Sequence, residues 1–80
     1  MLKYQYTLRK DNNEIYKIIF EDKEIEDYMR YIRGVYIHLA WIEQKNMQTG
    51  ETIVYFVHQN NGYIYEYMTY AKYDRKGVRI

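Results

Sequence analysis

The residues best suited to acid–base or metal chemistry in this chain are its two histidines, His38 and His58. Imidazole titrates near neutral pH and is the commonest protein ligand for metals. A strand pairing across residues 46–50 would place the two side by side, with Tyr65 next to His58. A zinc site needs three or four ligands, however, and Glu66 falls on the opposite face, so the ligand set is incomplete. We therefore expect two half-exposed strand histidines and no metal or cofactor.

The sequence offers few candidate residues for nucleophilic catalysis. The chain contains no cysteine and no serine, and its four glycines fall at expected turns or in the C-terminal segment. A glycine-rich phosphate loop, which needs several glycines at fixed spacing before a helix, is not found. Because an active site requires several convergent groups, we expect a binding protein rather than an enzyme.

Aromatic side chains indicate one kind of ligand. Tyr63, Tyr65 and Tyr67 alternate along one segment, so they should project from one face of a strand at intervals of about 6.8 Å. Arg75, Lys76 and Arg79 follow shortly afterwards. Sheets that bind single strands combine such an aromatic row with cations, so a nucleotide or a single-stranded nucleic acid is one predicted ligand.

Charge and composition favour a protein target instead. The net charge is only +1, from 12 basic and 11 acidic residues, whereas a general nucleic-acid binder carries a clear basic excess. Tyrosine makes up 12 of the 80 residues, and it is enriched at recognition surfaces because it offers a large contact area at low entropy cost. The abundance of Ile, Lys, Asn, Tyr and Phe, which have AT-rich codons, is typical of an AT-rich genome, such as that of a low-GC bacterium, its phages or an archaeal virus.

The leading hypothesis is a small, non-enzymatic protein-binding factor in the cytoplasm, of the kind with which phages and mobile elements inhibit host or defence proteins. We expect no leader peptide, and the sequence contains no apolar run of about 20 residues, the length that spans a bilayer. The acidic run 21–27 could imitate nucleic-acid phosphates, although acids also simply stabilise the start of a helix. The expected binding residues are Tyr36, His38, Phe56, His58, Tyr63, Tyr65, Tyr67, Arg75 and Arg79.

These residues are positioned by one predicted α+β domain spanning residues 1–80. Alternating apolar and polar side chains indicate half-buried strands, and one segment instead repeats its apolar side chains with a helical period. Asp11–Asn13 and Asn61–Gly62 have turn chemistry. The predicted order is ββαβββ, a five-stranded antiparallel sheet with one helix, over residues 2–9, 15–20, 23–33, 35–43, 52–59 and 63–73, followed by a charged tail, 74–80, that should fray.

The helix is the most clearly marked element. Asp22 suits the N-cap position and Gly34 suits the left-handed position after the C-terminus. On the outer side, Glu26 and Arg30 have the spacing of an ion pair. Apolar side chains at i, i+3, i+4 and i+7 form one stripe that should be buried: Ile25, Tyr28, Met29 and Ile32.

Turn lengths set the predicted registers. A two-residue Asn61–Gly62 turn pairs Phe56 with Tyr67, and a five-residue connection pairs Trp41 with Tyr55. The first hairpin would place Tyr16, Ile18 and Phe20 beside Leu8, Tyr6 and Tyr4. The face under the helix would then carry Val35, Ile37, Leu39, Trp41, Ile53, Tyr55, Val57, Ile64, Met68 and Tyr70, and the opposite face Tyr36, His38, Phe56, His58, Tyr63, Tyr65 and Tyr67.

The proportions of the sheet predict a partner. A helix of about twelve residues is roughly 18 Å long and 10 Å wide, whereas five strands span roughly 24 Å, so one helix leaves a face bare. An exposed tyrosine-rich face can stay in water, but monomers rarely expose large apolar patches, and a short chain without disulfides has a marginal core. We therefore expect a homodimer, formed through Tyr36, Phe56, Tyr65 and Tyr67 or through an edge strand.

Overall fold

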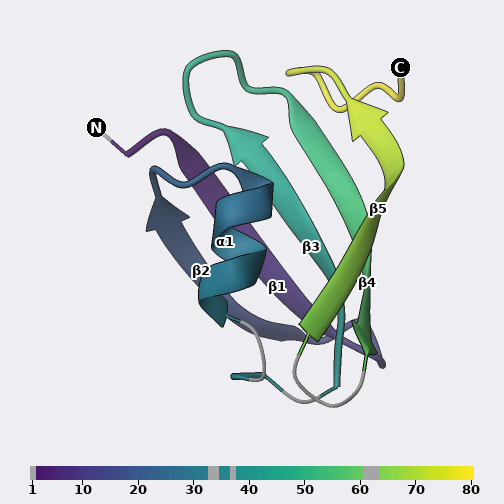
Figure 1. Ribbon diagram of the computed structural model, residues 1–80. Coiled ribbons are helices and arrows are strands. Elements are labelled where there is room, and N and C mark those ends of the chain that lie inside the picture. Colours follow the sequence, from purple (N-terminus) through teal and green to yellow (C-terminus); the bar gives the residue numbers. More distant parts are fainter. Residues whose placement is uncertain (1, 33–34, 37, 61–63) are drawn as a thin grey trace.

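An antiparallel sheet of five strands carries one helix (Figure 1). The computed structural model describes residues 2–32, 35–36, 38–60 and 64–80. The predicted α+β class and the order ββαβββ are confirmed. The elements are β1 (Tyr4–Lys10), β2 (Ile15–Glu21), α1 (Ile25–Ile32), β3 (Leu39–Asn46), β4 (Thr52–Asn60) and β5 (Ile64–Tyr73).

The strand order β2-β1-β3-β4-β5 explains why a helix is needed. β1 pairs antiparallel with both β2 and β3, so β2 and β3 run in the same direction with β1 between them. Such strands require a crossover connection, usually a helix, and α1 crosses one face of the sheet (Figure 1). We call this the covered face. The other, the open face, presents a row of directly paired residues across β1, β3, β4 and β5: Arg9, Trp41, Phe56 and Met68.

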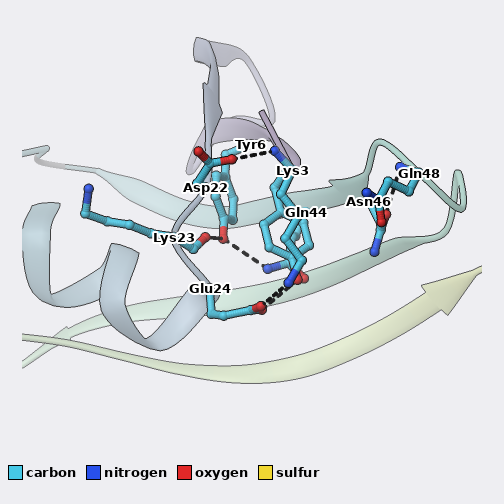
Figure 2. Close-up of polar contacts among 9 residues, drawn as sticks. Lys3, Tyr6, Asp22, Lys23, Glu24, Gln44, Asn46 and Gln48 are labelled. Atoms are coloured by element: carbon cyan, nitrogen blue, oxygen red, sulfur yellow. Dashed lines mark hydrogen bonds and ion pairs between the residues drawn. The ribbon is translucent and has the colours of Figure 1, made fainter. Parts of the chain in front are cut away.

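The helix begins two residues later than predicted. Its first described backbone bond runs from the Tyr28 N–H to the Glu24 carbonyl, at 2.9 Å. The Asp22 carboxylate, predicted to cap the helix, instead accepts the backbone N–H of Lys3 at 2.8 Å (Figure 2). Asp22 therefore fastens the chain before the helix to the chain before β1.

The buried stripe of the helix is confirmed. Tyr28, Met29 and Ile32 are buried, and Ile25 is partly buried against the same core. On the outer side, the Arg30 guanidinium donates to Glu26 at 2.7 Å, as predicted. No helix among the described residues is both long and apolar enough to cross a membrane.

Two stacked tyrosines form the centre of the core. The rings of Tyr6 and Tyr28 lie 4.5 Å apart at an angle of 12°, with side chains 0% and 1% exposed. The Tyr6 hydroxyl donates to the Lys23 carbonyl and accepts from Gln44 Nε2 at 3.0 Å (Figure 2). Burial raises the pKa of both phenols above the usual value. The other buried members of this cluster are Tyr4, Leu8, Met29, Ile32, Leu39, Ile42, Val57 and Tyr65.

Each predicted hairpin register is wrong by one residue over most of its length. The first hairpin pairs Thr7 with Ile18, the second pairs Trp41 with Phe56, and the third pairs Phe56 with Met68. Because successive side chains of a strand point to opposite faces, a slip of one residue reverses the facing of a strand relative to its neighbour. In the third hairpin, Asn60 pairs with Ile64, so three residues rather than two separate the paired strands.

These slips exchange residues between the two faces. Trp41, Met68 and Tyr70, predicted to lie under the helix, belong to the open face, where Met68 and Tyr70 are 66% and 51% exposed. Tyr65 and Tyr67, predicted to lie on the bare face, belong to the covered face, where Tyr65 is only 6% exposed. Both alternations of β4 and β5 are largely apolar, so burial could be satisfied in either register.

The other predictions of which face a residue occupies are partly confirmed and partly wrong. Leu39, Tyr55 and Val57 are buried, as predicted, whereas Val35 precedes β3 and is exposed. Ile18 projects toward the open face, because it pairs with Thr7 rather than with Tyr6. The predictions for Gly34, Ile37, Asn61, Gly62, Tyr63 and the side chain of Ile64 lie outside the described residues.

The C-terminal tail, predicted to fray, folds back along β5. The Asp74 carboxylate accepts the N–H groups of Lys76 and Val78, each at 2.9 Å, and closes a tight turn. Beyond the turn, Arg79 bridges to Tyr73. The tail therefore becomes part of the sheet margin, at the same end as the β3–β4 connection (Figure 1).

Candidate binding groove on the open face

A groove of about 810 Å³ lies on the open face, over β3, β4 and β5 and beside the returning tail. Its floor is aromatic, with Trp41 from β3, Phe56 from β4 and Tyr70 from β5. Its rim is mostly polar and charged. We call this site the aromatic groove, and its charged lining residues are Arg9, Glu43, Lys45, Asp74, Arg75 and Lys76.

The aromatic floor depends on the strand pairing and on one irregularity in it. Trp41 pairs directly with Phe56, and their rings meet edge-on with centroids 6.2 Å apart. The β4–β5 ladder shifts between Val54 and Tyr55, which leaves Tyr70 as the extra residue of a bulge. A bulge re-aims a side chain, and the Tyr70 ring lies 4.3 Å from that of Phe56. Three rings of different strands thus form one platform.

Glycine at position 50 allows the tail to close one end of the groove. A Cβ on this residue would lie 2.7 Å from the Arg75 Cβ, and the backbone φ is +79°, which L side chains rarely adopt. Both features require glycine here. The contact brings Arg75 and Lys76 to the groove.

The cations of the groove outnumber its acids. Arg9 Nε donates to Glu43 at 2.6 Å, and the Asp74 carboxylate is engaged in its own turn. Among the described residues, Lys45, Arg75 and Lys76 form no ion pair, and the Arg79 guanidinium lies 5.7 Å from the centroid of the Tyr70 ring. With Arg79 included, five cations face two carboxylates, an excess of three positive charges.

The helix side of the molecule carries the compensating acids. The segment 21–30 contains five acidic residues and two basic ones. The Glu24 carboxylate accepts a hydrogen bond from Lys3 Nζ at 2.6 Å (Figure 2) and another from the Tyr4 hydroxyl at 2.6 Å. These hydrogen bonds lower the pKa of Glu24. The net charge of the chain is therefore small because a basic groove on one side and an acidic surface on the other nearly cancel.

The predicted histidine pair does not form. His38 precedes β3, has a φ of +61° and lies 3.4 Å from an oxygen of Asp11. His58 is exposed on the open face, directly opposite Glu66 rather than on the other face from it. Within the described part of the chain, no group of three or more His, Asp or Glu side chains could hold a metal ion.

The other predicted site residues are divided between the two faces. Phe56, Arg75 and Arg79 meet at or beside the aromatic groove. Tyr36 packs against the core, and its carbonyl accepts the hydroxyl of Tyr65. Burial raises the pKa of the Tyr65 and Tyr67 phenols, because desolvation disfavours their charged forms. These tyrosines therefore serve the core and not the groove, and Tyr63 lies outside the described residues.

Sequence reasoning missed Trp41, Tyr70, Arg9 and Lys45 as groove residues. One signal was available for β3, because the predicted register places Glu43 on the covered face with Trp41. Burying a carboxylate is costly unless it is paired, and that conflict favours the other facing. None of the ladder irregularities, at Leu8/Arg9, Arg9/Lys10 and Val54/Tyr55, has a glycine or proline that would mark it.

Comparison of the chain with protein-family models, curated proteins and solved structures gives no match. The function is therefore inferred from the chemistry of the groove itself.

Proposed function

We propose that the protein binds single-stranded nucleic acid in the aromatic groove, as a non-enzymatic factor in the cytoplasm. The observation that carries this proposal is the coincidence of an aromatic floor and surplus cations in one groove. Bases would stack on Trp41, Phe56 and Tyr70, and phosphates would contact Lys45, Arg75 and Lys76. Proteins that bind single strands without sequence preference use this combination.

The floor suits bases because its rings are accessible. Phe56 is 40% exposed and Tyr70 is about half exposed, so each offers part of its ring to a ligand. Base–aromatic stacking contributes about 1–3 kcal/mol per base. The Arg79 guanidinium already lies over Tyr70, and a planar cation in this position can stack on a base as well.

The distribution of charge favours a strand over a duplex or a single nucleotide. A duplex keeps its base faces stacked inside, where the floor could not reach them. A mononucleotide site usually gathers backbone N–H groups around one phosphate, at a helix N-terminus or a glycine-rich loop. Here α1 lies on the covered face, and the cations are side chains spread along the groove. Spread cations match a row of phosphates.

A protein target, which composition favours, is the second candidate. The observation that favours it is the apolar exposure beyond the groove, at Met68 and Phe20. Such a target would use the apolar part of the open face, and its affinity would depend less on Lys45 and Lys76. Inhibition of a host or defence protein belongs to this second candidate.

Binding can be measured with the chain's single tryptophan, which forms part of the floor. Titration with a 12-nucleotide oligo(dT) or oligo(U) at about 50 mM salt should quench Trp41 fluorescence, because a base would stack against the indole. Tyr70→Ala should weaken binding roughly 5- to 150-fold at every salt concentration, the loss expected for one stacked base. Tyr31→Ala, which removes an exposed tyrosine on the helix side, is the matched control and should have no effect.

The salt dependence tests the cations separately. Lys45→Ala with Lys76→Ala should flatten the slope of log K against log salt by about 1.4, since each phosphate contact on a single strand contributes about 0.7. Lys23→Ala on the helix side should leave the slope unchanged. Unchanged Trp41 fluorescence with both oligonucleotides would refute the proposal. Capture of a protein that survives nuclease treatment and requires Met68 and Phe20 would then support the second candidate.

A further inference from the structure

The two margins of the sheet differ in how their backbone is covered. β5 is one margin, and the returning tail covers its C-terminal end through the Tyr73–Arg79 bridge and a 2.9 Å bond from the Ile80 N–H to the Lys72 carbonyl. β2 is the other margin and pairs only with β1 (Figure 1). Among the described residues, no backbone group outside the sheet bonds to residues 17–20. Within this part of the chain, the N–H and C=O groups on the outer side of that stretch therefore have no backbone partner.

The side chains of β2 are unusually apolar for an exposed margin. Ile15, Ile18 and Phe20 are each about half exposed, at 49%, 47% and 52%. Exposed margins are normally protected by charges, proline or bulges, because they pair readily with other strands. β2 has one lysine, Lys17, near its middle and no proline, and its one irregularity leaves Tyr16 as an extra residue, so the pairing with β1 is regular from Lys17 to Glu21. A margin of this kind is suited to pairing with another strand.

We infer that β2 pairs antiparallel with β2 of a second copy, about a twofold axis through Ile19. In this register Lys17 lies opposite Glu21 of the other copy, and Ile18 lies opposite Phe20. The symmetry repeats each pair, so the strand matches itself in both charge and apolar surface. Within the described residues Lys17 forms no ion pair, and the Glu21 carboxylate accepts the Asp22 backbone N–H at 3.1 Å and pairs with Lys23 at 3.5 Å.

Neighbouring registers lack this match. An axis through Ile18 would set Lys17 opposite Ile19 and leave Glu21 opposite Ile15. An axis through Lys17 would oppose two lysines, and like charges directly across a ladder are destabilising. Only the axis at Ile19 combines two opposite-charge pairs with two apolar pairs.

The pairing would create one continuous ten-stranded sheet. A twofold axis perpendicular to the sheet keeps both open faces on the same side, so two aromatic grooves would face one ligand. Simultaneous use of both grooves rests on the proposed function, whereas the dimer itself does not. One strand from each copy makes a small interface, so dissociation is expected at roughly micromolar concentrations, the weak end for protein interfaces.

Charge exchange tests the register. In sedimentation velocity experiments between about 5 and 500 µM, the parent chain should move from monomer to dimer. Lys17→Glu alone and Glu21→Lys alone should each weaken dimerisation about tenfold, because each replaces two opposite-charge pairs with two like-charge pairs. The double variant, with the charges exchanged, should restore it. A parent that stays monomeric at 500 µM, or a double variant no better than the singles, would overturn the inference.

A disulfide gives an independent measure of the axis, because the chain contains no cysteine. Directly opposite residues have Cα atoms about 4.5–5.5 Å apart, within disulfide range, so Ile19→Cys should form a covalent dimer on mild oxidation. Ile18→Cys is the matched control and should stay monomeric, because its symmetry mate is displaced along the strand. Faster or more complete cross-linking of the Ile18→Cys variant than of the Ile19→Cys variant would refute this register. Oligonucleotide binding by an undimerised chain would leave the proposed function intact.

Discussion

Removing the hydroxyl of Tyr28 should stabilise the protein. The Tyr28 side chain is 1% exposed, and its hydroxyl is buried without a hydrogen-bond partner among the described residues. Its stacked neighbour Tyr6 is equally buried, but the Tyr6 hydroxyl bonds to the Lys23 carbonyl and to Gln44. The two phenols therefore form a matched pair that differs in hydrogen bonding and not in burial.

The expected magnitudes follow from this difference. A buried polar group without a partner costs about 1–3 kcal/mol, so Tyr28→Phe should raise the free energy of unfolding by about 1 kcal/mol. In a chain of this size that corresponds to a rise in Tm of about 4–8 °C. Tyr6→Phe loses two bonds and leaves the Gln44 amide and the Lys23 carbonyl without this partner, so it should lower the free energy of unfolding by about 2–3 kcal/mol.

Urea unfolding followed by Trp41 fluorescence measures the free energy of unfolding of both variants. Similar m-values would show that the two variants expose the same surface on unfolding. Equal destabilisation by Tyr28→Phe and Tyr6→Phe would refute the reasoning, because it would mean that the Tyr28 hydroxyl also makes a stabilising hydrogen bond.

Two further predictions concern the same core. Ile32→Ala should lower the free energy of unfolding by about 2–4 kcal/mol, because it removes a fully buried aliphatic group. Glu26→Ala should lower it by under about 0.5 kcal/mol, because its ion pair is exposed. Equal losses for the two variants in urea unfolding would show that the buried stripe of the helix does not provide the packing. Burial raises the folded-state pKa of Tyr6 and Tyr28. The contribution of these two protonated phenols to the free energy of unfolding is therefore fully present below the unfolded-state pKa near 10. It is lost as the pH rises above that value, by up to about 1.4 kcal/mol per pH unit for each phenol. Replacing either with Phe should make alkaline destabilisation less steep, and an unchanged slope in melts between about pH 9 and 11 would contradict this.

Helix placement could be predicted from the sequence because its pattern has one solution. Tyr28, Met29 and Ile32 recur with a helical period among charged residues, so only one side of the segment can be buried. The number and order of the strands follow similarly from alternation between turn residues. Each of these features is encoded within a short stretch of chain.

Strand facing and the groove were decided only by tertiary structure. β4 and β5 are apolar on both alternations, so either register buries enough surface, and the choice depends on the ladder irregularities at Arg9/Lys10 and Val54/Tyr55. The second of these turns Tyr70 toward Phe56 and completes the floor. The return of the tail across Gly50 then brings Arg75 to the groove. These contacts join residues far apart in the chain, and no local periodicity encodes them, because the energy that selects them arises only when the strands pack together.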